Sequence, residues 1–238
     1  QHKNVYYLFM PIFRLTDEIL FPDPELADDG WLAVGGDLRP ERLLLAYMHG
    51  IFPWPMGEGY EITWASPEMR LLLYPEEFRP SRRLLRTIKQ GKFSVKFDTQ
   101  FEQVIRHCAG VPRRHEDGTW ITRDIQQAYT GLHQLGFAHS VETYQEGELV
   151  GGMYGLSLGG AFFGESMFYR VSDASKVALH ALVQKMRAWN FDFLDAQVRT
   201  EHMVSMGARE IPRRDYLQQL EKTLQRNTRR GPWTFEIA

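Results

Sequence analysis

The stretch "AHSVETYQEGELVGGMYGLSLGGAFFGES", residues 138–166, decides the fold of this chain. It holds three strand-like runs, joined only by the links EGE and GG: 138–145, 149–158 and 161–166. Such short, glycine-bearing links join antiparallel neighbours, because a parallel connection needs a crossover of a dozen or more residues. The stretch therefore predicts an antiparallel meander. The glycines at 151, 152 and 155 are expected to permit bulges or close approach of strands.

Elements of both kinds flank the meander. Residues 172–190 repeat apolar side chains at helical spacing, with Ser172 or Asp173 as the N-cap, and a strand is expected over 191–198. Further patterns predict helices at 81–92, 99–109 and 122–136, a strand at 93–98, a short helix near 200–207 and a helical, basic tail. We therefore expect an α+β fold with a mixed sheet flanked by helices.

The beginning of the chain differs in character. Residues 1–66 are rich in Pro and Gly turns around one predicted helix, "RPERLLLAYMHG", with Pro40 at its start and Gly50 as its stop. We predict a small, turn-rich N-terminal domain over 1–66 and a larger domain over 67–238.

Composition excludes several classes of protein. The chain has 238 residues, of which 43% are hydrophobic, with 28 basic against 30 acidic residues, so its overall charge does not predict nucleic-acid binding. A single cysteine, Cys108, rules out an internal disulfide, and no Cys/His set has zinc spacing. No apolar run approaches a membrane span, and residues 1–10 lack the order of a secretory signal. A cytoplasmic protein is therefore expected.

Polar residues interrupt two of the predicted strands. In 191–198, alternation would put Phe193, Asp195 and Gln197 on one face, where the polar pair must form a satisfied network, reach solvent at the strand end, or line a cavity. Glu165, in "FFGESMF", either faces water in a turn or holds a cationic substrate group. Two such interruptions in one domain favour a reactive site.

Aromatic and basic residues add a possible nucleic-acid interface. Trp54 and Trp120 stand in turn-like settings, where their rings either stack on a nucleobase or bury area in the core. The run 79–96 contains seven cations and no anion: Arg79, Arg82, Arg83, Arg86, Lys89, Lys92 and Lys96. Its helical part is either a phosphate-binding face or an ordinary solvated one.

These motifs together resemble a known family. In order and spacing, the chain resembles the bacterial leucyl/phenylalanyl-tRNA–protein transferases from about Phe21 to Tyr216. The motifs are "GWLAVGGDL", "GIFPW", "GTWIT", "ELVGGMYG", "GESMF", "ASKVAL", "DAQV" and "GAREIPRRDY". The resemblance implies an enzyme that moves Leu or Phe, and less well Met, from aminoacyl-tRNA to the α-amino group of proteins with N-terminal Arg or Lys. It also implies marking of those proteins for the N-degron pathway, a GNAT-like larger domain, and no need for metal or ATP. By analogy, a monomer is expected.

The resemblance also implies roles for single residues. Asp195 and Gln197 would form the reacting centre, and Trp54 and Trp120 would bracket the terminal adenosine. The cations expected to hold the tRNA backbone are Arg79, Arg82, Arg83, Arg86 and Lys89. The other residues expected to bind substrate are Met153, Phe162, Glu165, Ser166, Met167, Phe168, Leu179 and Leu182.

The residue types suggest how that centre would work. The Gln197 amide is too weak a base to remove a proton, so we expect it to aim the amine, with Asp195 orienting and polarising Gln197. Two alternatives stay open: an acetyltransferase that uses acetyl-CoA, and a non-catalytic tRNA-binding protein. The first lacks its glycine-rich pyrophosphate loop before the "ASKVAL" helix. The second leaves Glu165, Asp195 and Gln197 unexplained.

Overall fold

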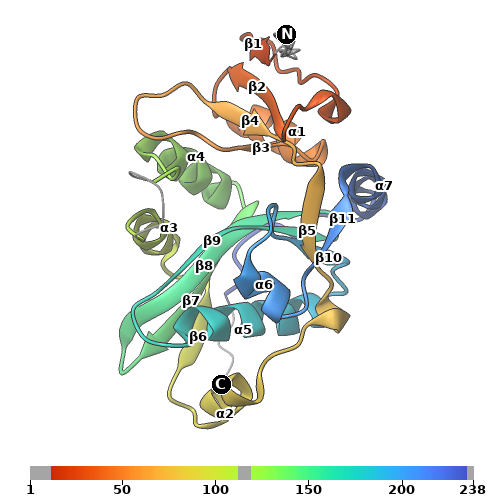
Figure 1. The fold of residues 1–238 in the computed structure, drawn as a ribbon. Coiled ribbons are helices and arrows are strands. Elements are labelled where there is room, and N and C mark those ends of the chain that lie inside the picture. The colour runs from red at the N-terminus through yellow and green to blue at the C-terminus, as the bar shows by residue number, and fades with distance from the viewer. Residues whose placement is uncertain (1–11, 112–118, 235–238) are drawn as a thin grey trace, which may run out of the picture.

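The structure, a computed structural model, describes residues 12–111 and 119–234. The described chain forms a small sheet near its N-terminus and a large sheet beneath it, with helices on both faces of the large sheet (Figure 1). The chain leaves the small sheet after Ala65 and enters the large one at Met69. The predicted mixture of helices and a mixed sheet, with a distinct N-terminal part, is confirmed.

The small sheet has the order β1-β2-β4-β3 and packs on helix α1. Its elements are β1 Phe13–Leu15, β2 Trp31–Gly35, α1 Pro40–Met48, β3 Phe52–Pro53 and β4 Thr63–Ala65. Helix α1 begins at Pro40 and the chain turns at Gly50, as predicted. Gly50 has a φ of 71°, and a Cβ there would lie 2.8 Å from the ring of Tyr216, so only glycine fits both the turn and the contact.

The large sheet has the order β11-β5-β10-β9-β8-β7-β6. Its strands are β5 Met69–Leu73, β6 Ser94–Phe97, β7 Ala138–Gln145, β8 Glu148–Leu158, β9 Ala161–Tyr169, β10 Phe193–Asp195 and β11 Arg209–Pro212. The predicted meander is confirmed, since β7, β8 and β9 are antiparallel neighbours. Strand β10 pairs parallel to β9, and the chain makes this crossover through helix α5.

Two apolar cores cover the two faces of the large sheet. Alternation along β9 sends Phe163 into the core shared with α3, α4 and the small sheet, and Phe162 into the core shared with α2, α5 and α6. The helices are α2 Arg82–Lys89, α3 Phe101–Ala109, α4 Arg123–Gln134, α5 Ala174–Ala188, α6 Glu201–Ser205 and α7 Arg213–Leu224. Within the described ranges, no helix is both long and apolar enough to cross a bilayer.

Three local expectations need correction. The strand expected over 191–198 ends at Asp195, because Gln197 adopts a left-handed backbone with a φ of 57°. Asp173 stands at the cap of α5 but is left-handed, and its side chain makes no capping hydrogen bond. Strands β5 and β11 were not predicted; β5 pairs with β11 on one side and with β10 on the other, both far away in sequence.

Candidate active site

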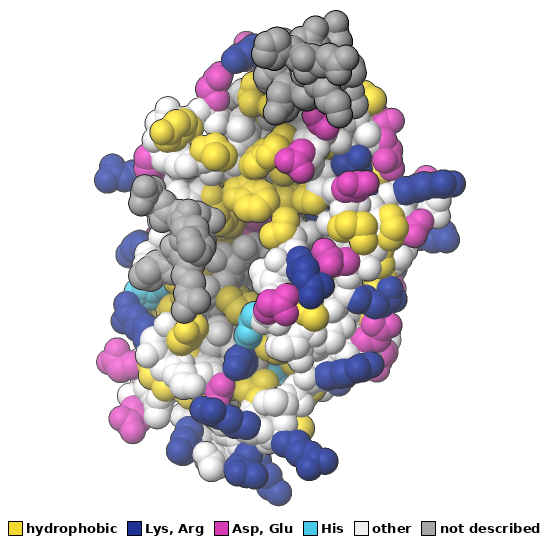
Figure 2. Space-filling view, viewed as in Figure 1, with side chains coloured by type: hydrophobic (Ala, Val, Ile, Leu, Met, Phe, Trp, Pro, Cys, Tyr) yellow, Lys and Arg dark blue, Asp and Glu magenta, His cyan; other side chains and the backbone are white. Residues whose placement is uncertain are grey.

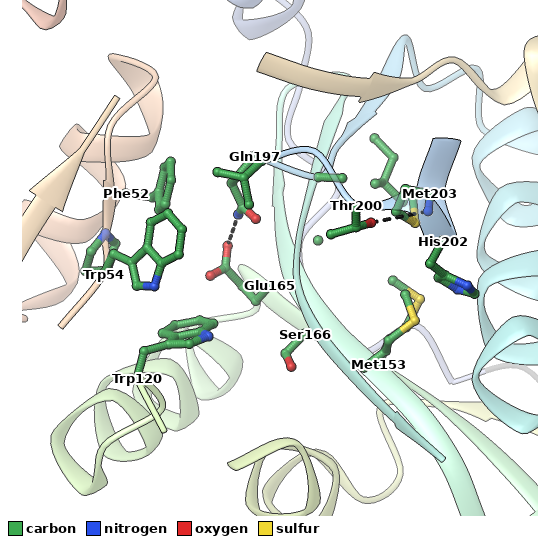
Figure 3. A pocket seen from close by; sticks show the side chains of 16 residues that line it. Phe52, Trp54, Trp120, Met153, Glu165, Ser166, Gln197, Thr200, His202 and Met203 are labelled. Atoms are coloured by element: carbon green, nitrogen blue, oxygen red, sulfur yellow. Dashed lines mark hydrogen bonds between the residues drawn. The ribbon is translucent and has the colours of Figure 1, made fainter. Parts of the chain in front are cut away.

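A cavity of about 330 Å³ opens where the small sheet meets the large one. Figure 2 shows hydrophobic side chains gathered in this hollow, and Figure 3 shows its walls. The small sheet and the loop after it supply Phe52 and Trp54, and the segment before α4 supplies Trp120. The large sheet, the loop after β10 and α6 supply the rest, including Met153, Glu165, Ser166, Met167, Gln197, His202 and Met203.

Glu165 is the ionisable group at the centre of this wall. Its Oε1 accepts hydrogen bonds from the Tyr47 hydroxyl and from Gln197 Nε2, both at 2.8 Å, and its Oε2 accepts one from Tyr129 at 3.3 Å. Burial raises the pKa of Glu165 to about 7, although the bonds from Tyr47, Gln197 and Tyr129 oppose the shift. A carboxyl with that pKa exchanges its proton near neutrality.

The two tyrosines explain why both forms of Glu165 are tolerated. Tyr47 and Tyr129 also hydrogen-bond to each other, so there are three contacts: one between the tyrosines and one from each tyrosine to Glu165. When Glu165 is ionised, only the two hydroxyl protons are available for these three contacts. A protonated Glu165 supplies the third proton and closes a ring of three donors. Burial beside Glu165 raises the pKa of both tyrosines well above the usual value, so the hydroxyls keep their protons.

Gln197 is held from two sides. Its side-chain Nε2 donates to Glu165 (Figure 3). Its backbone N–H donates to Asp195 Oδ1 at 2.9 Å. The left-handed backbone at Gln197 turns its side chain into the cavity wall instead of along a strand face. Because the nitrogen is committed to Glu165, the amide oxygen is the end free to accept from a ligand.

Asp195 lies behind this wall and does not line the cavity. It is fully buried, binds Arg70 through Nε and Nη2 at 2.8–3.0 Å, and accepts from Tyr216 at 2.7 Å. The expected side-chain contact between Asp195 and Gln197 is therefore corrected. Asp195 fixes the backbone of Gln197, whereas Glu165 orients its amide.

The other residues singled out in the sequence divide into two groups. Trp54 and Trp120 line the cavity and are half-exposed, and Met153, Ser166 and Met167 line it too. Phe162, Leu179 and Leu182 do not reach its wall; they are fully buried in the same core as Met153. Phe168 instead lines a second groove. The cations of the basic run, Arg79, Arg82, Arg83, Arg86 and Lys89, are exposed on and beside α2. Within 12–111 and 119–234, no three His, Cys, Asp or Glu side chains are grouped as metal ligands.

Glu165, Gln197 and Asp195 together form the polar centre of the site. The sequence analysis did not identify the residues that support this polar centre. Tyr47, Tyr129, Arg70 and Tyr216 come from four separate elements. Only Arg70 left a signal, since a cation between apolar neighbours in "MRLLLY" is the same kind of interruption as Asp195. Arg70 also donates to the Gly50 carbonyl at 3.0 Å, so it ties the polar centre to the end of α1.

Comparison with known proteins gives one consistent result. Residues 72–221 match the family profile described as leucyl/phenylalanyl-tRNA protein transferase, and residues 36–68 match the N-terminal domain of the same family. Curated relatives named leucyl/phenylalanyl-tRNA–protein transferase include one from Desulfatibacillum aliphaticivorans, 52% identical over 95% of this chain and 97% of the relative. Another, from Anaeromyxobacter sp. (strain Fw109-5), is 54% identical over the same shares.

A third such relative, from Myxococcus xanthus (strain DK1622), is 52% identical over 94% of this chain and 97% of its own length. Among solved structures, a conserved protein of Staphylococcus epidermidis ATCC 12228 reaches a TM-score of 0.42 at 8% identity, covering 76% of this chain and 68% of that one. About half of the residues are identical to those of these relatives along nearly the whole chain. This identity alone shows the family, and the structural likeness is not needed for it. The chain belongs to the leucyl/phenylalanyl-tRNA–protein transferase family.

Proposed function

We propose that this protein moves Leu or Phe, and less readily Met, from aminoacyl-tRNA to the α-amino group of proteins that begin with Arg or Lys. The observation that carries the proposal is the cavity in which a largely apolar wall meets the Glu165–Gln197 pair. Membership of the family supports the donor, since its relatives are named for leucyl- and phenylalanyl-tRNA.

The apolar wall suits the donor. The terminal adenosine would stack between Trp54 and Trp120, because every base offers a π-face to an aromatic ring. The side chain of Leu or Phe would lie against Met153 and Met167, whose flexible thioethers adapt to both shapes. Phe162, Leu179 and Leu182 would shape this pocket from behind, through the core that they share with Met153.

The polar wall suits the acceptor. In the proposed step, the neutral amine attacks the ester carbonyl carbon, the bond from that carbon to the ribose oxygen breaks, and a peptide bond forms. The ribose oxygen gains a proton and the amine loses one, so no metal or cofactor is needed for the balance. The Gln197 oxygen would accept a hydrogen bond from the amine and aim its lone pair at the ester.

Glu165 would act on the acceptor through charge. Its ionised form orients the Gln197 amide and favours a cationic acceptor group beside it. Ser166, the next residue in the wall, offers a further polar contact. The exposed cations of α2 would hold the tRNA backbone without reading bases.

The wider context stays at the level of prediction. We propose that the protein works as a monomer in the cytoplasm, where its products would enter the N-degron pathway. The division at residues 66 and 67, and the GNAT-like description of the large sheet, also stay predictions.

A transfer assay tests the proposed function. Phenylalanyl-tRNA and a reporter protein with N-terminal Arg should give a phenylalanylated product, and a reporter with N-terminal Gly should not. Gln197→Ala should lower kcat about 100-fold, because the amine loses its positioning, while tRNA affinity changes little. Gln218→Ala, on the exposed face of α7, is the matched control. The absence of any product on the Arg reporter would defeat the proposal.

A further inference from the structure

A second, larger groove adjoins the cavity. It has a volume of about 920 Å³ and shares the lining residues Met167 and His202 with the cavity, so the two spaces lie next to each other. It runs between the end of α3, the end of β9 and the start of α5. The roles described above leave the charged residues of its lining unused.

The groove is lined by cations with little opposing charge. Arg106, Arg170 and Lys176 line it, and Asp173 is its one acidic lining residue in the described ranges. The carboxylate of Asp173 is shared between two cations, since it lies 3.5 Å from Lys176 and 3.7 Å from Arg83 of α2. Within those ranges, no carboxylate forms an ion pair with Arg170, whose guanidinium instead contacts the His107 ring. Arg106 also lies 3.9 Å from Glu102, which is not part of the lining. The lining residues that the structure describes therefore carry a net positive charge.

Two further features of the lining favour an anion in this groove. Burial, and then the charges of Arg170 and Arg106, lower the pKa of His107, as expected for an imidazole beside cations. The N-terminus of α5 also opens into the groove, with Ser175 as a buried polar residue of the lining and no side-chain cap from Asp173. A helix N-terminus attracts phosphate oxygens, because its first backbone N–H groups and the helix dipole favour negative charge.

The ends of the groove identify the anion. One end meets the cavity proposed to hold the aminoacyl-adenosine, and the other meets the basic helix α2 through the Arg83–Asp173 contact. Figure 2 shows Lys and Arg side chains gathered over α2 at the foot of the molecule. Resting on the proposed function, we propose that this groove binds the phosphodiester backbone of the single-stranded 3′ end of the tRNA, just before its terminal adenosine.

Donors of increasing length test the proposal. The double variant Arg170→Gln/Lys176→Gln is compared with the wild type on phenylalanyl-adenosine, phenylalanyl-CpCpA and phenylalanyl-tRNA. We expect kcat/KM to fall about tenfold with the two donors that carry phosphates, and much less with phenylalanyl-adenosine, because only charged contacts are lost. The double variant Arg214→Gln/Lys222→Gln, on exposed positions of α7, removes the same charge elsewhere. Equal unfolding midpoints of all three proteins exclude a folding defect.

The outcomes separate the two proposals. The groove assignment would be overturned if kcat/KM of the double variant fell equally with all three donors, or only with full-length tRNA. It would also be overturned if the loss depended on which acceptor peptide is used. If the wild type transfers phenylalanine from none of the three donors, the proposed function itself is overturned. As a second measurement, adding CpCpA that carries no aminoacyl group should raise the pKa of His107 in an NMR titration of the wild type, because its anionic phosphates relieve the positive field. An unchanged titration would also overturn the groove assignment.

Discussion

At the scale of single residues, the polar centre separates structural from reactive groups. Asp195 is sealed in the interior with Arg70 and Tyr216, whereas Glu165 and Gln197 face the cavity. Asp195 has a structural role, because it is the partner of the buried Arg70 guanidinium. The carboxylate that is surrounded mainly by hydroxyls and an amide can change its charge near neutral pH.

Glu165 should make stability depend on pH in a predictable direction. Its folded pKa of about 7 exceeds the ordinary value of 4.5, so between these values the folded state binds more protons than the unfolded state. The free energy of unfolding should therefore fall as pH rises from 5 to 8, and Glu165→Gln should remove the part of this fall that Glu165 causes. Thermal melts of both proteins at pH 5 and pH 8 measure the difference.

Glu142 does not confuse that comparison. Burial raises its pKa to about 7 as well, but it is present in both proteins, so its contribution cancels in the difference. If the wild type and Glu165→Gln differ in melting temperature by the same amount at pH 5 and at pH 8, the assignment of the pH dependence to Glu165 is contradicted.

Asp195→Asn should be strongly destabilising. The change leaves the buried Arg70 charge without its carboxylate, and loss of one partner of a buried pair costs about 3–5 kcal/mol. Asp192→Asn is the matched control, because Asp192 pairs with Arg226 at the surface and such pairs contribute less than about 1 kcal/mol. Urea unfolding of both variants measures the contrast, and similar losses would refute it.

At the scale of elements, irregularities in regular strands build the site. The register of β8 against β9 shifts between Tyr154 and Gly155, and β10 ends at Asp195 just before the left-handed Gln197. A bulge increases local twist and re-aims the side chains that follow it. The shift lies next to the pairing of Tyr154 with Ser166, one residue from Glu165.

Gly155→Ala should therefore disturb the sheet. A Cβ at Gly155 would lie 2.1 Å from the carbonyl oxygen of Phe163 and 2.6 Å from the ring of Phe162, and neither can move without breaking the sheet or the core. We expect a loss of more than about 2 kcal/mol in the free energy of unfolding. Gly131→Ala, in α4 with open space around it, should instead gain about 0.5–1 kcal/mol. Urea unfolding that shows no difference between these variants would reject the role of Gly155.

Helix α2 should contribute to the affinity for tRNA without distinguishing one tRNA from another. Its exposed face carries Arg82 and Arg86 one turn apart, which suits a phosphate backbone. The variant Arg82→Gln/Arg86→Gln should weaken every tRNA alike and reduce the slope of log affinity against log salt by roughly 0.9 for each lost phosphate contact. Binding titrations at several salt concentrations test this expectation, which an unchanged slope would contradict.

At the scale of the whole molecule, the site exists only where the two sheets meet. Tyr47 and Trp54 come from the small sheet and its helix, whereas Glu165 and Gln197 come from the large sheet and the loop after β10. Buried contacts hold the parts together, including the bond of 2.6 Å from Arg213 to the Ser66 carbonyl.

The two parts should therefore unfold together. In urea, tryptophan fluorescence and far-ultraviolet circular dichroism should report one coincident transition, because separation of the sheets would leave buried charges and carbonyls without partners. Arg213→Met should move both signals to lower urea by the same amount. Two separate transitions in the wild type would contradict this view.

The sequence by itself determined the elements whose signals are local. The meander over residues 138–166, helices α1 and α5, and the glycine at the bulge follow from alternation, helical spacing and turn chemistry, which act between near neighbours. The same local patterns drew attention to Glu165 and Gln197 as polar residues among apolar ones.

Only the tertiary structure decided which of those polar residues face a ligand. Strand β5 forms between β10 and β11, which lie far from it in the sequence, and Asp195 becomes structural because Arg70 and Tyr216 arrive from distant segments. The raised pKa of Glu165 likewise needs burial beside Tyr47 and Tyr129, which no spacing in the sequence encodes. Long-range packing sets these contacts, and packing depends on shape in three dimensions rather than on order along the chain.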